Sequence, residues 1–266
     1  MRPLYDAMVD LYCRKYGYSA SDVEDAAVKY LSEHRKLALK NPKSTMFSVT
    51  YEEEAKQNGF SDLKSYLTNP KFNPLMGSYI RSRYMGLSCD GAAAVIVCAK
   101  EVAYKHTKKP IEIAGVATAG CSTKTYAQLP TSCDVQIFKD LYSMAGITDP
   151  YRELDWMSVH DCPLTNIFGV AEAAGFVREG EAMKYMLETG FGADGDKHIN
   201  TCGGRSQLGH PLSPAFNVVL SECVDQMRGE AGDRQLTNPP RASVCWILGS
   251  GLNVGACVLK APRSER

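Results

Sequence analysis

The sequence predicts an α/β protein in which a sheet carries helices on both faces. The main observation is an alternation along the second half of the chain. Short apolar runs typical of strands alternate there with segments whose apolar residues recur at helical spacing. In addition, most of these segments end at glycine or proline, the residues that commonly terminate helices and strands. At 266 residues the chain can bury a sizeable core in one or two domains.

The overall composition is that of an ordinary globular protein, with 44% hydrophobic and 23% charged residues. Thirty basic and thirty acidic side chains cancel, which argues against nucleic-acid binding, because nucleic-acid-binding proteins usually carry a basic excess. No apolar run is long enough to cross a bilayer, and the first residues lack the apolar core of a signal peptide.

Ten cysteines are scattered along the chain without a Cys-x-x-Cys pair. Several lie in apolar runs, where a free cysteine behaves as a small hydrophobic residue. This usage is typical of a reducing compartment. We therefore expect a cytoplasmic protein with no disulfide framework, no zinc site and no other metal.

Two helices are predicted at the start of the chain. Residues 4–16 carry apolar side chains at helical spacing, and Gly17 ends that helix. Ser19 and Ser21 are N-cap candidates for a second helix over residues 22–39. The stripe that we expect this second helix to bury consists of Val23, Ala26, Ala27, Tyr30 and Leu31.

Residues 43–86 follow the helix-ending pair Asn41-Pro42 and are polar, interrupted by proline and glycine, and only weakly periodic. We expect a long excursion over the surface, of the kind that is often functional or disordered. An unbroken apolar run from Ala92 to Ala99 comes next, and it predicts a strand covered on both faces.

The remainder of the chain alternates between the two kinds of element. Helices are predicted over residues 101–106, 135–145, 165–175, 179–188 and 215–227. Strands are predicted over residues 111–119, 156–159, 241–248 and 254–259, with one more short strand ending at residue 199. The last two strands flank the turn Gly249-Ser250-Gly251 and would form a hairpin.

Three loops that follow predicted strands carry residues suited to chemistry. They hold His160 and Cys162, His210, and Gly249. Open α/β sheets place ligands beyond the ends of their strands, so we expect these loops to converge. An imidazole can shuttle the proton of a thiol near neutral pH. Backbone N–H groups of a glycine turn can bind a developing oxyanion.

Each of these residues also has a structural interpretation. The loop of His210 could be a capped loop with a structural histidine, and on spacing alone the two interpretations are about equally supported. Cys162 could be an inert buried thiol, which is the commoner fate of cysteine. For Gly249, a plain hairpin turn is the better-supported interpretation from spacing alone.

Five motifs in the same order resemble the thiolase superfamily. Residues 200–211 resemble its Asn-x-x-Gly-Gly loop leading to Gly-His-Pro. His160-Asp161-Cys162 resembles the His-Asp-Cys-Phe motif of the sterol-carrier-protein type of thiolase. The other matches lie at residues 90–95, 228–235 and 251–256. The similarity extends over nearly the whole chain, from about Tyr5 to Lys260.

The resemblance implies a thiolase-like layered α/β/α fold with an incomplete N-terminal half and a complete C-terminal half. Residues 1–108 would be the remnant of the N-terminal domain, with residues 43–86 as its substrate-shaping loop region. Residues 109–266 would form the C-terminal domain. Members of the superfamily are dimers or tetramers, so the resemblance also implies an oligomer.

The resemblance further implies an acyltransferase of lipid metabolism that acts on acyl-CoA thioesters. The reaction would be thiolytic cleavage of a 3-oxoacyl-CoA or the reverse Claisen condensation, with coenzyme A as co-substrate and no bound cofactor. His210 would activate the nucleophilic thiol, and His160 and His210 would line the oxyanion hole for the thioester oxygen. Cys162 would move the α-proton, and the Gly249 N–H would contribute to a second oxyanion hole.

The sequence also departs from the family pattern. The N-terminal part that holds the family's nucleophilic cysteine has no counterpart, and Pro163 and Ile247 replace family residues. We expect the nucleophile to come from a thiolase-fold partner chain or from a missing segment. A zinc-ribbon and OB-fold partner is a further expectation. The alternatives are a retro-aldol carbon–carbon lyase on a CoA-linked substrate and a non-catalytic interaction subunit.

Overall fold

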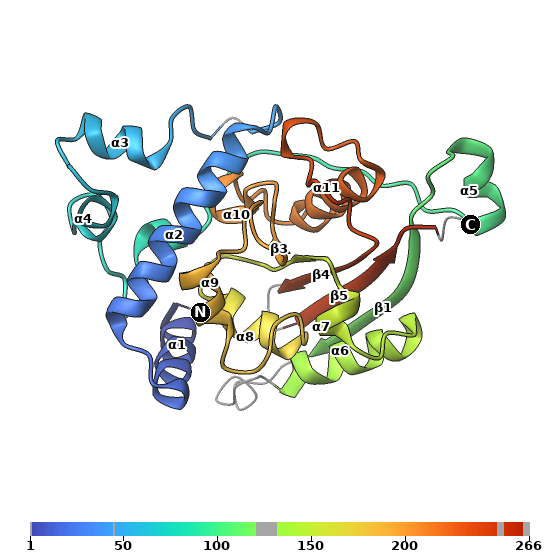
Figure 1. Ribbon diagram of the computed structural model, residues 1–266, viewed down its shortest axis with the longest axis horizontal. Coiled ribbons are helices and arrows are strands. Elements are labelled where there is room, and N and C mark those ends of the chain that lie inside the picture. The colour runs from blue at the N-terminus through green and yellow to red at the C-terminus, as the bar shows by residue number, and fades with distance from the viewer. Residues whose placement is uncertain (1, 45, 121–131, 249–252, 263–266) are drawn as a thin grey trace.

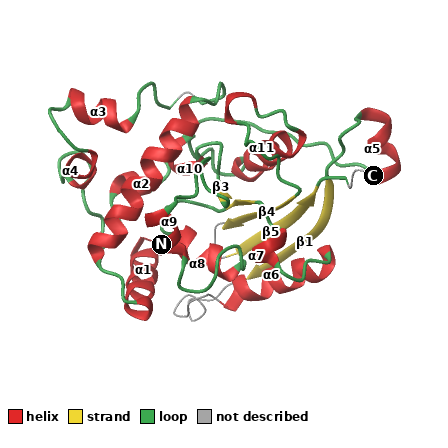
Figure 2. Ribbon diagram, in the orientation of Figure 1, coloured by secondary structure: helices red, strands yellow, loops and turns green. Residues whose placement is uncertain are grey.

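The computed structural model describes residues 2–44, 46–120, 132–248 and 253–262. A five-stranded mixed sheet forms its centre, and helices lie against both faces of this sheet (Figures 1 and 2). The predicted α/β class is therefore confirmed.

The strands follow the order β1-β5-β4-β2-β3 across the sheet. Their bounds are Glu112–Gly120 for β1, Trp156–Ser158 for β2, His198–Ile199 for β3, Ala242–Leu248 for β4 and Asn253–Lys260 for β5. Strand β5 pairs antiparallel with β1 and with β4, which confirms the predicted pairing of the last two strands. Strand β2 is parallel to β3 and to β4, so these three strands end at the same edge of the sheet.

Alternate residues of β4 point to two separate hydrophobic layers. Val244 and Trp246 belong to the large core that contains residues of α6 (Ser132–Ala145) and α8 (Asn166–Ala173). Cys245 belongs to a second cluster with residues of α11 (Ala215–Arg228). The sheet is therefore the middle layer of an α/β/α arrangement, with α11 on one side and α6 and α8 on the other (Figure 1).

The two N-terminal helices form where the sequence predicts them. Helix α1 spans Arg2–Tyr16, and α2 spans Ala20–Leu39. Ser19 caps α2, and its side chain and that of Asp22 form a reciprocal capping box. The predicted stripe of α2 is completely buried.

The excursion over residues 43–86 contains more regular structure than its sequence indicates. Two short helices, α3 (Tyr51–Gln57) and α4 (Leu63–Thr68), lie within it together with a 3₁₀ turn, η1 (Ser82–Tyr84). The side chains of Thr50 and Asp62 cap α3 and α4. Because each helix has only one or two turns, neither presents enough apolar positions for a helical period to appear.

The predicted strand from Ala92 to Ala99 is wrong. This segment has no regular secondary structure, and it is exposed along most of its length. Ile96 is 96% exposed and Val97 is 69% exposed. A strand needs a neighbouring strand to take its backbone hydrogen bonds, and the described residues place none beside this segment. Helix α5 (Lys100–His106) follows as predicted.

Helix α9 (Ala182–Glu188) is also confirmed. The single-turn helices α7 (Pro150–Glu153) and α10 (Gly204–Gln207), and the 3₁₀ turn η3 (Gly232–Arg234), have no counterpart in the sequence prediction. Across the described ranges, no helix combines the length and apolar character that crossing a bilayer requires.

Candidate active site

The parallel strands bring two of the three predicted loops together at one edge of the sheet. The chain passes from β2 into the loop of His160 and Cys162, and from β3 into the loop that leads to His210. The Nε2 atoms of His160 and His210 lie 3.0 Å apart. A nitrogen of each ring and the Sγ of Cys162 all lie within 4.8 Å of one another. Gly249 lies outside the described residues.

Asn200 joins the ends of β2 and β3. It is fully buried and adopts a left-handed backbone conformation with φ of 53°. Its Oδ1 accepts hydrogen bonds from the Ser158 hydroxyl and the Val159 N–H, and its Nδ2 donates to the Val159 carbonyl. The asparagine of the Asn-x-x-Gly-Gly run therefore sets the path of both loops.

Asp161 joins the loop after β2 to α10. Its buried carboxylate accepts hydrogen bonds from the Tyr30 hydroxyl at 3.0 Å, the backbone N–H of Arg205 at 2.8 Å and the Ser206 hydroxyl at 2.8 Å. A fourth donor is the Ser206 N–H. Gly204 is required here, because its φ is 66° and a Cβ would lie 2.2 Å from a carboxylate oxygen of Asp161.

The bonding pattern of His210 assigns the protons of the imidazole pair. The Leu212 N–H donates to Nδ1 of His210 at 3.1 Å, so the neutral ring carries its proton on Nε2. That proton points to Nε2 of His160, which must act as the acceptor. His160 then carries its own proton on Nδ1, a buried atom without a hydrogen bond of normal geometry.

The surroundings favour neutral groups in this cluster. Burial lowers the pKa of His160 well below its ordinary value, and the positive charge of Arg205 lowers it further. The same two causes, in the same order, lower the pKa of His210. Burial raises the pKa of Cys162, although a hydrogen bond at 3.2 Å from the Gly86 N–H to its Sγ acts in the opposite direction. The site therefore holds two neutral imidazoles beside a neutral thiol at pH 7.

Two histidines and a cysteine are also typical zinc ligands. Two features of this cluster oppose a cation. The Leu212 N–H holds the proton of His210 on Nε2, the atom that would have to bind the metal. In addition, the buried guanidinium of Arg205 is close enough to repel a second positive charge. The arrangement suits proton transfer better than metal binding. The expected absence of a metal stays a prediction.

Sequence reasoning missed two residues of the site. Arg205 follows the glycine pair of the central loop, where no motif marks it. Tyr5 of α1 is buried near Cys162, and burial followed by the charge of Cys162 raises the pKa of Tyr5 to about 12. No local signal could have found Tyr5, because 157 positions separate it from Cys162 along the chain.

The cysteines can be compared with the expectation of no disulfide framework. Eight cysteines of the described part are free. The expectation of no disulfide framework needs a correction at one position, because Cys133 is disulfide-bonded. The spacing of cysteines along a sequence does not reveal such a bond.

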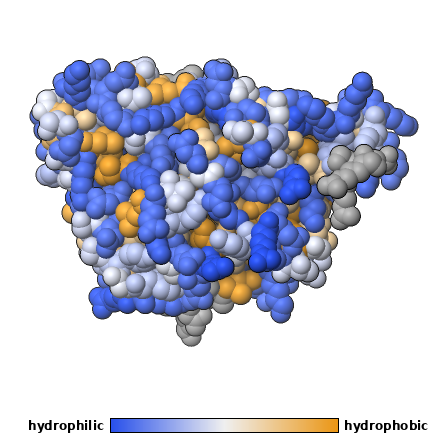
Figure 3. Space-filling view, in the orientation of Figure 1, coloured by the Kyte–Doolittle hydropathy of each residue, from blue (hydrophilic) through white to orange (hydrophobic). Residues whose placement is uncertain are grey.

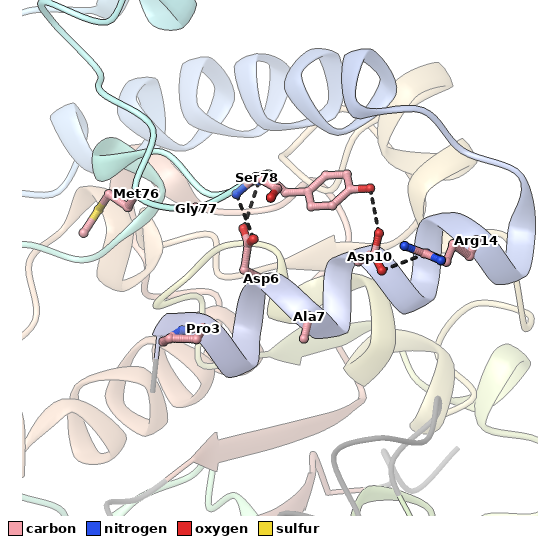
Figure 4. A pocket seen from close by; sticks show the side chains of 9 residues that line it. Pro3, Asp6, Ala7, Asp10, Arg14, Met76, Gly77 and Ser78 are labelled. Carbon is pink, nitrogen blue, oxygen red and sulfur yellow. Dashed lines mark hydrogen bonds and ion pairs between the residues drawn. The ribbon is translucent and has the colours of Figure 1, made fainter.

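A separate cavity of about 630 Å³ lies between α1 and residues 76–79 (Figure 4). Asp6 accepts backbone N–H bonds from residues 78–80. Asp10 bonds the Tyr79 hydroxyl and forms an ion pair with Arg14. Since both carboxylates already have partners, they fasten the excursion to α1 and offer little to a ligand.

The chain is similar to members of a known protein family. A family model described as "Thiolase C-terminal domain-like" matches residues 99–260. The acetyl-CoA acetyltransferase of Methanothermobacter thermautotrophicus is 33% identical over 165 residues, which cover 61% of this chain and 43% of that protein. Human sterol carrier protein 2 is 27% identical over 285 residues, covering 96% of this chain and 47% of that protein. The chain thus spans about half the length, or less, of these relatives.

Two solved structures share the fold. One is described as "Ltp2-ChsH2(DUF35) aldolase" and matches with a TM-score of 0.72 at 18% identity, covering 97% of this chain and 63% of that chain. The other is a monomeric SCP2-thiolase-like protein type 1 from Mycobacterium smegmatis. Its TM-score is 0.65 at 14% identity, and the match covers 97% of this chain and 51% of that chain.

Proposed function

The chain belongs to the thiolase superfamily, and on that premise we propose that it is a subunit or fragment of a thiolase-like acyltransferase that acts on acyl-CoA thioesters. The reaction is thiolytic cleavage of a 3-oxoacyl-CoA or the reverse Claisen condensation, with coenzyme A as co-substrate. The observation that carries this proposal is the 3.0 Å contact between the imidazoles of His160 and His210, with the thiol of Cys162 beside them.

In this proposal, the imidazole pair receives the thioester oxygen. The Nε2–H of His210 turns from His160 to the carbonyl oxygen and stabilises the negative charge that develops there. In its Nε2–H tautomer His160 donates a second hydrogen bond to the same oxygen, because the Nε2–H of His210 then no longer occupies its Nε2. Cys162 transfers the α-proton. The role of Gly249 in a second oxyanion hole remains part of the proposal, on the family pattern alone.

The nucleophilic thiol comes from a thiolase-fold partner chain or from a segment outside this sequence. Support comes from the path of residues 87–89, which pair with the backbone of His210. The exposed apolar segment 92–99 follows directly. The start of this segment lies beside the loop of His210, since a Cβ on Gly91 would lie 3.0 Å from Pro211. A zinc-ribbon and OB-fold protein is a further partner in the proposal.

The experiment that tests the proposal is CoA-dependent cleavage by the assembled enzyme. The chain is co-expressed with the product of the adjacent gene, and the loss of acetoacetyl-CoA is followed with and without free CoA. His210→Ala should lower kcat about 100-fold or more, since the loss of one oxyanion-hole donor typically costs that much. His106→Ala, an exposed histidine of α5, is the matched control. Unchanged turnover in the His210 variant would end the catalytic role of this residue.

A retro-aldol lyase on a CoA-linked substrate is the second candidate. Two observations favour it. Ile247 replaces a residue of the family pattern, and the structure that matches with a TM-score of 0.72 is described as an aldolase. A lyase would form its product without consuming free CoA, so the CoA dependence of the assay separates the two reactions. A non-catalytic subunit would lose no turnover when His160, Cys162 and His210 are all replaced.

A further inference from the structure

Arg205 is a buried cation whose guanidinium has few partners. The residue is only 2% exposed. Nη1 donates to the Val159 carbonyl at 3.0 Å, whereas Nε and Nη2 have no hydrogen-bond partner in the described part of the chain. Burying a charge without a counterion is costly, and such groups are more common at functional sites than in ordinary cores.

The nearby carboxylate does not pair with this guanidinium. Asp161 already accepts hydrogen bonds from the Tyr30 hydroxyl, from the backbone N–H groups of Arg205 and Ser206, and from the Ser206 hydroxyl. Within the described residues, no ion pair joins the Arg205 guanidinium to any acid. The positive charge is therefore only partly compensated, and it acts on the groups around it.

The groups around Arg205 are those of the candidate active site. The guanidinium of Arg205 bonds the carbonyl of Val159, the residue directly before His160. A Cβ on Gly86 would lie 2.8 Å from the Arg205 carbonyl oxygen and 3.2 Å from the Cβ of His210, so the backbone of Arg205 also runs beside His210. The charges that act on His160 are those of Arg205 and His210, and those that act on His210 are Arg205 and Asp161. Arg205 is the largest influence on both imidazoles after burial itself, and it also lowers the pKa of Cys162.

We propose that Arg205 is a positioning residue of this site: its buried guanidinium keeps the His160–His210 pair neutral and linked by a single proton, and it adds positive charge behind the point where a substrate oxygen becomes negative. The claim about the substrate oxygen rests on the proposed function. The claim about the imidazole pair concerns the free chain alone, so the two claims can fail separately.

The state of the pair is measured in the full-length wild-type chain by NMR with ring-¹⁵N-labelled histidine. His160→Gln and His210→Gln assign the signals. We expect both rings to titrate below the ordinary histidine range, because burial and the charge of Arg205 lower the pKa of His160 and of His210. We also expect the proton of His210 on Nε2 and that of His160 on Nδ1. Titration of both rings at or above the ordinary value would overturn the proposal without any Arg205 variant.

Arg205→Met removes the charge and retains most of the length of the side chain, whereas Arg205→Lys retains the charge. In Arg205→Met, both imidazole midpoints should rise by about one pH unit, and Arg205→Lys should return them most of the way. Arg152→Met, a highly exposed arginine, is the matched control. Unchanged midpoints in folded Arg205→Met would refute the role, and Arg205→Gln provides the same comparison if the Met variant does not fold.

In the assembled enzyme, the acidic limb of the pH profile of kcat should move to higher pH by the same amount in Arg205→Met, with little change in KM. A purely structural residue would lower activity equally at all pH values. If the assembled enzyme shows no turnover at all, the proposed function fails, while the NMR titration still decides the state of the imidazole pair.

Discussion

At the scale of single residues, Asp161 has the most consequential set of contacts near the site. Its carboxylate takes four hydrogen bonds from α2 and from the first turn of α10 while its own loop carries His160 and Cys162. Hydrogen bonds to an ionised acceptor are stronger than those between neutral groups. Asp161 therefore holds together three segments that are far apart in sequence.

We expect Asp161→Asn to lower the free energy of unfolding by about 2–4 kcal/mol, because an amide NH₂ would then face buried donors that need an acceptor. Urea unfolding followed by circular dichroism measures this change. Asp233→Asn, which alters an exposed aspartate of η3, is the control and should be nearly neutral. Equal effects of the two substitutions on the free energy of unfolding would show that Asp161 does not hold these segments together.

At the scale of elements, α2 meets the loop after α9 through Glu33. A Cβ on Gly190 or Gly192 would touch the carboxylate of Glu33, and one oxygen of this carboxylate is buried without a partner. Burial raises the pKa of Glu33 to about 7, and the charge of Asp194 acts in the same direction. The folded chain therefore prefers Glu33 in its protonated form.

This preference makes stability depend on pH. Because the folded pKa lies above the unfolded value of 4.5, the contribution of Glu33 is fully present below 4.5 and is lost as the pH rises to about 7. Glu33→Gln should raise the free energy of unfolding by about 1–2 kcal/mol at about pH 8 and change it little at about pH 4. Urea unfolding at both pH values checks this, with the exposed Glu188→Gln as control. An increase in the free energy of unfolding seen only at about pH 4 would contradict a raised pKa of Glu33.

At the scale of the whole molecule, the chain leaves apolar surface uncovered. Val95, Ile96 and Val97 are exposed in segment 92–99, and Val116 is 55% exposed on the edge strand β1. Within the described ranges, β1 pairs with β5 alone. Apolar side chains also remain visible between hydrophilic ones on the face drawn in Figure 3. Unpaired edges and apolar patches of this kind are typical of surfaces that another chain covers.

We expect the double substitution Ile96→Lys and Val97→Lys to weaken assembly with the partner chain about tenfold or more, since charged side chains oppose strand pairing and apolar burial. Sedimentation of the co-expressed complex measures the assembly. Leu75→Lys changes a residue that is 50% exposed elsewhere and is the control. If the complex still assembles with Ile96→Lys and Val97→Lys but not with Leu75→Lys, segment 92–99 is not the segment that pairs with the partner chain.

Features that depend on neighbouring residues were predictable from the sequence. The apolar stripe of α2, its cap at Ser19 and the hairpin strands β4 and β5 follow from periodicity and turn residues, which are local properties. The motif residues His160, Cys162 and His210 were identified in the same way, by short patterns. The division into domains at residues 108 and 109 stays a prediction, and Gly249 lies outside the described residues.

Only the tertiary structure decided how distant residues meet. The 3.0 Å contact of two imidazoles 50 positions apart depends on β2 and β3 being parallel neighbours, which no local pattern encodes. The proton positions in that pair depend on the Leu212 N–H, and the burial of Arg205 depends on packing around α10. The run from Ala92 to Ala99 has the composition of a strand, but a strand exists only where a second strand supplies its hydrogen bonds.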